Sequence, residues 1–274
     1  MSTQSPPTTD QYLQLLDLTY EVAQSLKGKP SSDSRWPDCQ QLATKLFFHA
    51  ATVYWLREAS TKAPVPSSLN GCSFHDFPSV AVLTRAALET YLTMFEVFFE
   101  PATEDEFEFK HALWLLSGFV IRENYVSSDP ALQSQFANAQ KEIQDMRIRL
   151  QKTKKYKSLK PGEQRKVSKG EAIRSWKVAA KAAGFGEKTI QRMYAYYSGY
   201  VHADGLSGTQ IVTAKTAQDQ VEHIEIHMRT IMIVLSKMIL DYAKKFPEAK
   251  AACDKNPDAY YRAEIWSGAA SRLP

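Results

Sequence analysis

The sequence has only three cysteines, no long apolar run and no recognisable leader. Cys39, Cys72 and Cys253 are widely spaced and form no Cys-x-x-Cys pair, which argues against a disulfide framework and a thiolate metal site. The longest apolar runs are far shorter than the about 20 residues that cross a bilayer, so we expect no membrane partner. The first ten residues lack the basic start and apolar stretch of a secretory signal. These absences together favour a reducing, cytoplasmic location.

Strand patterns and nucleotide-binding loops are missing as well. No segment alternates apolar and polar residues between turn signals, which argues against β-strands. No phosphate-cradling glycine loop, nucleophile elbow or dinucleotide fingerprint is present, so we expect no cofactor. The 274 residues, 44% of them hydrophobic, nevertheless suffice to bury a substantial core.

Apolar residues recur at three- and four-residue spacing along most of the chain, which predicts an all-α protein. We expect a single antiparallel bundle of about eight helices over residues 10–246, preceded by a disordered lead (1–9) and followed by a poorly specified tail (247–274). Thr216 is the expected N-cap of the last long helix. Residues 130–170 should form a protruding basic helix–loop arm. Its loop, residues 156–169, has too few apolar residues to offset the entropy of ordering it.

Basic charge is concentrated in one stretch of the chain. Residues 147–181 contain thirteen Lys or Arg against two Glu, so they contribute +11 to a total of +4 and leave −7 elsewhere. Such a block binds nucleic-acid phosphates through counterion release, or it is a solvated segment between helices. Both interpretations remain open at this point. The candidate RNA-binding side chains are Lys154, Lys155, Lys157 and Lys160.

A narrow polar stripe crosses an otherwise apolar helix expected over residues 79–96. Arg85 and Glu89 stand four residues apart, so they lie on one helix face and can form an ion pair. If this face borders a groove, the guanidinium suits a phosphate or a carboxylate. The alternative is that the stripe is only the wet side of a surface helix.

A later helix, expected over residues 187–203, carries a second stripe. Tyr194, Ser198 and His202 follow one another at intervals of four and share a face, where they could meet the first stripe. His202 ends the helix, and the helix dipole there favours the protonated imidazole, as acid–base chemistry requires. The alternative is a histidine that merely caps the helix or packs on a tyrosine.

His223 and His227 are one helical turn apart, which is a spacing that permits metal binding. However, they do not form a His-Glu-x-x-His motif, and no third ligand is evident in the sequence. We therefore expect no metal site.

The segments Arg85-Ala-Ala-Leu-Glu89 and Tyr197-Ser-Gly-Tyr-Val-His202 resemble a group of bacterial all-helical proteins of unknown function. In these proteins an Arg-x-x-x-Glu helix precedes a Ser-x-x-x-His helix end. They look related to the HEPN superfamily, which contains RNA-cleaving toxins, antiphage proteins and inactive binding modules. The resemblance covers about residues 40 to 245.

The resemblance implies a homodimer that interacts with RNA and cleaves it without metal, through attack by the ribose 2′-hydroxyl. His202 would then be the acid–base residue and Arg85 the oxyanion stabiliser oriented by Glu89, while Tyr194 and Ser198 would line the site. The sequence departs from the family pattern, in which an arginine shortly precedes the histidine on one helix. Here the nearest upstream arginine, Arg192, does not share a face with His202.

Two other functions fit the same residues. A non-catalytic interaction or sensor module would use the polar stripes only to support the fold. A small enzyme acting on a phosphate or a nucleotide would use Arg85 to hold the anion.

Overall fold

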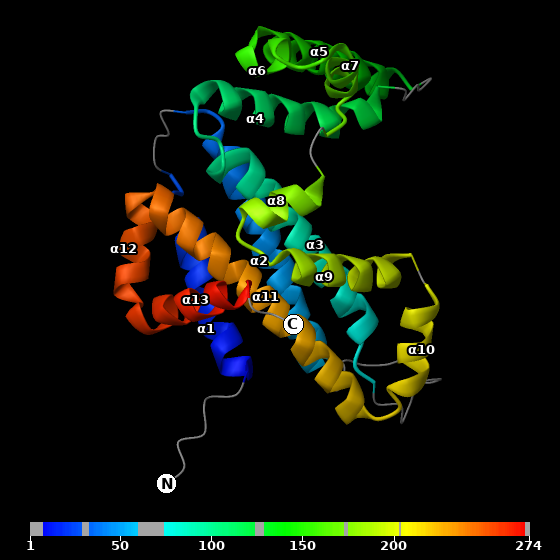
Figure 1. Ribbon diagram of the computed structural model, residues 1–274, viewed down its shortest axis with the longest axis vertical. Helices are drawn as coiled ribbons and strands as arrows, with labels where there is room; N and C mark the ends of the chain where they lie inside the picture. The colour runs from blue at the N-terminus through cyan, green and yellow to red at the C-terminus, as the bar shows by residue number, and fades with distance from the viewer. Residues whose placement is uncertain are drawn as a thin grey trace. The chain divides into compact units, whose positions relative to one another are not determined.

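The computed structural model describes residues 8–28, 33–59, 74–123, 129–172, 175–202 and 204–271. Within these ranges every regular element is a helix, which confirms the predicted all-α class. The described residues form thirteen α-helices together with one π-helical and one 3₁₀ segment (Figure 1). There are more than the eight helices expected, because further helices form in segments that were expected to be loop or tail.

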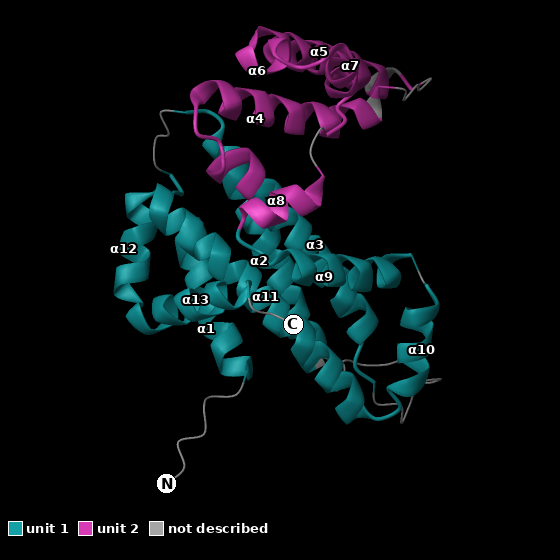
Figure 2. Ribbon diagram, in the orientation of Figure 1, with its two compact units in different colours: residues 1–94, 184–274 teal, residues 95–183 magenta. Residues whose placement is uncertain are grey.

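The chain divides into two compact units, where the sequence analysis expected one bundle with an arm (Figure 2). Unit 1 comprises residues 1–94 and 184–274, and unit 2 comprises residues 95–183. The predicted arm, residues 130–170, therefore falls inside a larger unit. The physical reason is that α4 (Glu104–Phe119) packs against α5 (Pro130–Lys152) and gives unit 2 a core of its own.

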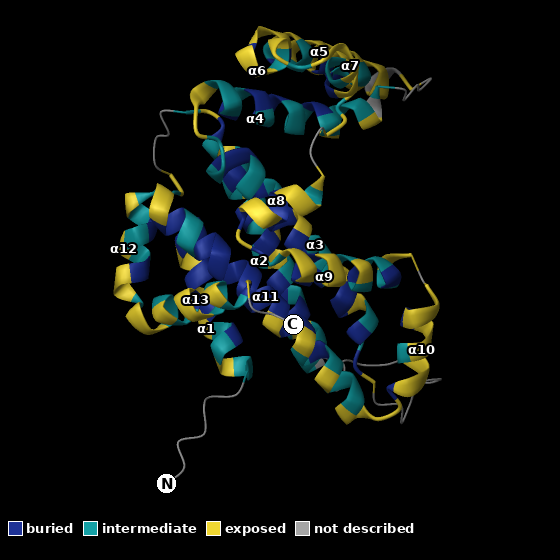
Figure 3. Cartoon of the chain, viewed as in Figure 1, coloured by how far each residue is buried: buried dark blue, intermediate teal, exposed yellow. Residues whose placement is uncertain are grey.

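Unit 1 is assembled on its longest helix. Helix α11 (Ala217–Lys245) begins at the predicted N-cap Thr216, whose hydroxyl accepts a hydrogen bond from the Asp219 backbone N–H. Every side chain from residue 230 to 239 is buried, and the middle of α11 is dark blue in Figure 3. A stretch of helix that is buried on all sides must be surrounded by other helices.

Five helices of unit 1 pack against α11. They are α1 (Thr8–Gln24), α2 (Trp36–Ala59), α3 (Phe77–Met94), α12 (Pro247–Lys255) and α13 (Pro257–Ala269). Two further helices, α9 (Glu187–Val201) and α10 (Gly205–Thr213), complete the unit, and α9 packs against α3 while α10 contacts α9.

Residues 247–274, expected to be a poorly specified tail with one or two helical turns, are more helical than expected in their described part. This part forms α12 and α13, which pack against α1 and α11. Ala249, Cys253 and Ala263 are completely buried there, because small side chains let the short helices approach their neighbours closely. Composition alone did not reveal this, since Pro257 starts α13 instead of disrupting it. The expected lead, residues 1–9, lies outside the described residues except that α1 already begins at Thr8.

In unit 2, the structure differs from the loop that was expected over residues 156–169. The described chain forms two short helices here, α6 (Lys154–Lys157) and α7 (Pro161–Ser168). Val167 is completely buried in the core of the unit, and Tyr156 and Leu159 pack against that core. Three well-placed apolar side chains thus order a segment that its overall polarity suggested was irregular. The remaining elements are η2 (Phe95–Phe99), η3 (Val120–Arg122) and α8 (Trp176–Ala182).

Candidate functional site

The predicted ion pair in α3 is present, and a tyrosine from α9 completes it. Arg85 Nε donates a hydrogen bond to Glu89 Oε1 at 2.8 Å, and one Nη donates to the Tyr194 hydroxyl at 3.3 Å. The guanidinium carbon lies 4.8 Å from the centre of the Tyr194 ring, a cation–π arrangement. Residues more than a hundred positions apart therefore meet in one cluster, which we call the Arg85 cluster.

Burial distinguishes the partners in the Arg85 cluster. The Arg85 side chain is 14% exposed, whereas that of Glu89 is 50% exposed. The second Nη of Arg85 is buried and has no hydrogen-bond partner among the described residues. A guanidinium held on two sides with one donor unused can receive an anion only if the side chain moves, since that nitrogen is closed to solvent.

Ser198 and His202 extend the same face of α9 beyond Tyr194. The backbone N–H of His202 donates to the Ser198 carbonyl at 3.0 Å and closes the helix. The His202 ring is exposed and has no hydrogen-bond or ion-pair partner among the described residues. It lies two turns, about 12 Å along the helix, from Tyr194. The structure thus joins Arg85, Glu89 and Tyr194 but shows no interaction between His202 and Arg85.

Gly199, inside the Ser-x-x-x-His segment, has a structural role that the sequence analysis did not identify. A Cβ at this position would clash with Oδ2 of Asp204, because the two non-bonded atoms would lie closer than their van der Waals contact distance. Asp204 is held there because it caps α10, accepting a hydrogen bond from the Ser207 N–H at 3.0 Å. The absence of a side chain at Gly199 therefore leaves room for the Asp204 carboxylate beside α9.

A buried histidine–tyrosine cluster joins α9 to α11. The Tyr197 hydroxyl donates to Thr230 Oγ1 at 3.0 Å and lies 3.4 Å from His227 Nδ1. Burial lowers the pKa of His227 to about 3, so the ring is neutral at physiological pH. Its Nε2 is buried without a hydrogen-bond partner among the described residues. His227 is therefore part of the core.

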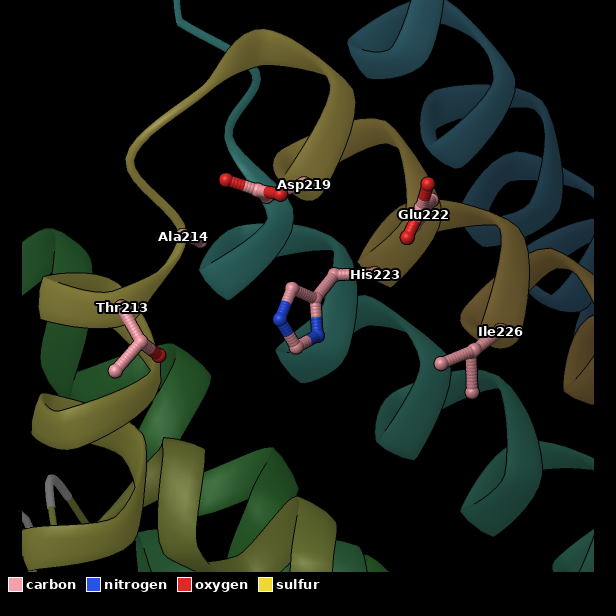
Figure 4. A pocket seen from close by; sticks show the side chains of 6 residues that line it. All are labelled: Thr213, Ala214, Asp219, Glu222, His223 and Ile226. Carbon is pink, nitrogen blue, oxygen red and sulfur yellow. The ribbon is translucent and has the colours of Figure 1, made fainter.

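His223, one turn earlier, has a different environment. Its ring stacks on Phe77 of α3, with 4.8 Å between ring centres and 18° between the planes. Among the described residues, no group of three or more His, Cys, Asp or Glu is arranged to hold a metal ion. His223 instead belongs to an open pocket of about 250 Å³, which the sequence analysis missed because its walls come from separate helices (Figure 4). The pocket is lined by Thr213, Ala214, Asp219, Glu222, His223 and Ile226.

The basic stretch lies in unit 2, and only part of its charge is neutralised there. Arg147 forms a two-pronged ion pair with Glu123 at 2.9 and 3.1 Å, and Arg149 does the same with Glu108 at 2.7 and 3.0 Å. By contrast, four lysines are exposed and form no ion pair with a described residue. These are Lys154, Lys155, Lys157 and Lys160.

Comparison with protein-family models, curated proteins and solved structures finds no match for this chain. None of the described helices is both long and apolar enough to cross a membrane. The function must therefore be argued from the geometry of the two units.

Gly199→Ala should destabilise the protein by about 1–3 kcal/mol, because the new methyl group displaces the Asp204 carboxylate. Gly208→Ala in α10 is the matched control, since a Cβ there meets no atom within 4 Å and alanine favours the helix. Urea unfolding of the three proteins measures both effects. Equal stability of the two variants would contradict the assigned role of Gly199.

The neutral His227 should make stability depend on pH. The folded-state pKa of His227 is lowered from 6.5 to about 3, so its contribution is complete above pH 6.5 and is lost as the pH falls from 6.5 toward 3. Between pH 7 and pH 5 the loss is about 2 kcal/mol, because the unfolded chain takes up the proton. Unfolding of wild type and His227→Phe at both pH values isolates this residue. Parallel pH profiles would show that His227 is not held neutral.

Proposed function

We propose that the protein binds nucleic acid through the basic surface of unit 2, defined by Lys154, Lys155, Lys157 and Lys160. The observation that carries this proposal is that these four lysines are exposed and unpaired with described residues, while the arginines that precede them are engaged in ion pairs. Closely spaced, exposed ammonium groups that form no salt bridge attract a phosphate backbone and release its counterions on binding.

The carboxylates nearest the lysines are used by the backbone. Asp105 accepts hydrogen bonds from the N–H groups of Lys154 and Lys155 at 2.7 and 2.8 Å, and these bonds are the main reason that its pKa is lowered. Glu163 accepts from the N–H of Lys160 at 3.0 Å. Both acids thus fix the turns that carry the lysines, although Asp105 also reduces the local charge.

The charge of the whole chain supports the same assignment. Unit 2 contains sixteen Lys or Arg and twelve Asp or Glu, a net charge of +4. Unit 1 contains eighteen of each kind and is neutral by the same count. The net positive charge that favours polyanion binding is therefore that of unit 2.

The decisive experiment measures binding of a single-stranded RNA at several salt concentrations. Substitution of all four lysines by Gln should weaken the binding of RNA of any sequence. It should also reduce the slope of log affinity against log salt concentration by up to about 3. The control neutralises four exposed lysines of unit 1, namely Lys188, Lys215, Lys244 and Lys255. Salt-insensitive binding, or equal losses in both variants, would refute the proposed surface.

A second candidate function is cleavage of the bound RNA without metal, as the HEPN resemblance implies. What favours it is the exposed His202 ring, which has no side-chain partner among the described residues and is accessible to a substrate. His202 would take the proton of the ribose 2′-hydroxyl as its oxygen attacks phosphorus, and would return a proton to the departing 5′-oxygen. Arg85, oriented by Glu89, would stabilise the phosphorane charge.

This candidate requires Arg85 and His202 to act on one phosphate, although in one chain the guanidinium is already held by Glu89 and Tyr194. A homodimer, also implied by the resemblance, would supply His202 of one copy and Arg85 of the other. RNA cleavage by wild type, His202→Ala and Arg85→Ala tests the candidate. The cleavage rate should fall at least a hundredfold in both variants, as expected for a general acid–base residue and an oxyanion stabiliser. Unchanged cleavage by the variants, or no cleavage by the wild type, would refute the candidate and leave RNA binding alone.

A further inference from the structure

Helix α10 in unit 1 carries three exposed aliphatic side chains. Leu206, Ile211 and Val212 are exposed by 53%, 53% and 70%, and Ile226 of the adjacent α11 is exposed by 54%. We call these four residues the α10 surface. The helix is coloured almost entirely as exposed in Figure 3, and only Ser207 within it is buried. Exposed apolar residues that gather into one patch are a common feature of protein interaction sites.

The α10 surface adjoins the pocket around His223, because Ile226 and Thr213, the last residue of α10, both line that pocket. No charged residue occurs from position 205 to 214, so the apolar part of this region is uncharged. The pocket, by contrast, is lined by two carboxylates, those of Asp219 and Glu222. The region therefore combines an apolar face with a small electronegative recess.

Each carboxylate has a defined local role that leaves acceptor capacity unused. Asp219 accepts a hydrogen bond from the Thr216 N–H at 2.9 Å, which completes the capping box of α11 and lowers its pKa, so this group is ionised. Glu222 accepts one hydrogen bond, from the Gln218 amide at 3.0 Å. A carboxylate offers about four acceptor positions, so both can bind further donors.

The flat imidazole ring of His223 forms part of the pocket wall. The imidazole of His223 lies among the lining residues, with Thr213 on one side and Ile226 on the other (Figure 4). Phe77 covers one face of the ring by parallel stacking. The Nδ1 atom of His223 is buried and has no hydrogen-bond partner among the described residues. The ring therefore contributes its flat surface to the pocket.

We propose that the α10 surface and the His223 pocket together bind a partner protein through a peptide segment in which an arginine is flanked by aliphatic residues. The guanidinium enters the pocket, stacks on His223 and donates hydrogen bonds to Glu222 and Asp219, while the aliphatic residues cover Val212 and Ile211. Charge complementarity selects a cation, and the flat ring favours the planar guanidinium over an ammonium group. A metal ion is the poorer fit, because the described residues offer no three-ligand group.

This surface lies in unit 1 and is independent of the nucleic-acid proposal, which concerns unit 2. The pocket volume of about 250 Å³ accommodates a single side chain, so the specificity should rest on one arginine. Burying the aliphatic neighbours supplies the nonpolar part of the affinity.

The test uses a fluorescent acetyl-Leu-Leu-Arg-Leu-amide peptide and the same peptide with citrulline, which keeps the shape and removes the charge. With the full-length protein, we expect at least fivefold tighter binding of the arginine peptide and a chemical-shift change at the His223 ring. Glu222→Gln should weaken arginine-peptide binding at least fivefold and reduce the preference over citrulline. Glu264→Gln, an exposed acid of α13 in the same unit, is the matched control and should change neither.

Val212→Ser tests the apolar half and should weaken both peptides by a similar factor of several-fold, since it lies outside the charged recess. Equal binding of arginine and citrulline peptides, or no binding by either, would overturn the proposal. The molar mass of the protein in solution tests whether a second copy of the chain occupies the α10 surface. A dimer that Val212→Ser dissociates would show that a second copy of the chain covers the surface instead.

Discussion

Unit 1 depends on the middle of α11, where every side chain from residue 230 to 239 is removed from water. Burial on all sides along about fifteen ångströms of helix requires neighbours on all sides, and α1, α2, α3, α12 and α13 provide them. Thr230 begins this buried stretch and also receives the Tyr197 hydrogen bond, so α9 is held by the same helix that organises the core. Both the Arg85 cluster and the α10 surface are consequences of where α9 is placed.

The polar groups of the two units serve different ends. In unit 1, Arg85 is largely enclosed by Glu89 and Tyr194, and His227 is kept neutral by burial, so both contribute first to the fold. In unit 2, Glu108 and Glu123 neutralise arginines, and Asp105 and Glu163 bind backbone N–H groups. The acids are thereby engaged in structure, and the lysine ammonium groups remain exposed. An excess of positive charge at a surface follows from this unequal use of partners.

Several features followed from local sequence patterns. The Arg85–Glu89 pair needs only a helix and a four-residue spacing, and Thr216 caps α11 because its hydroxyl and Asp219 satisfy the first free N–H groups. The order in residues 156–169 was not predictable in this way. Val167 is one apolar residue in a polar segment, and its contribution to the core depends on packing against residues of α4 and α5. The position of Asp204 against Gly199 likewise depends on a turn that local propensity does not specify.

The sequence by itself determined the helical class, the ion-pair spacing and the concentration of basic charge, because each depends on residues close together in the chain. Only the tertiary structure decided that the chain forms two units, that Tyr194 joins Arg85, and that His227 is buried while His223 lines a pocket. These outcomes depend on contacts between helices far apart in sequence. Periodicity reveals which face of a helix is apolar, but not which other helix, or which partner, will cover it.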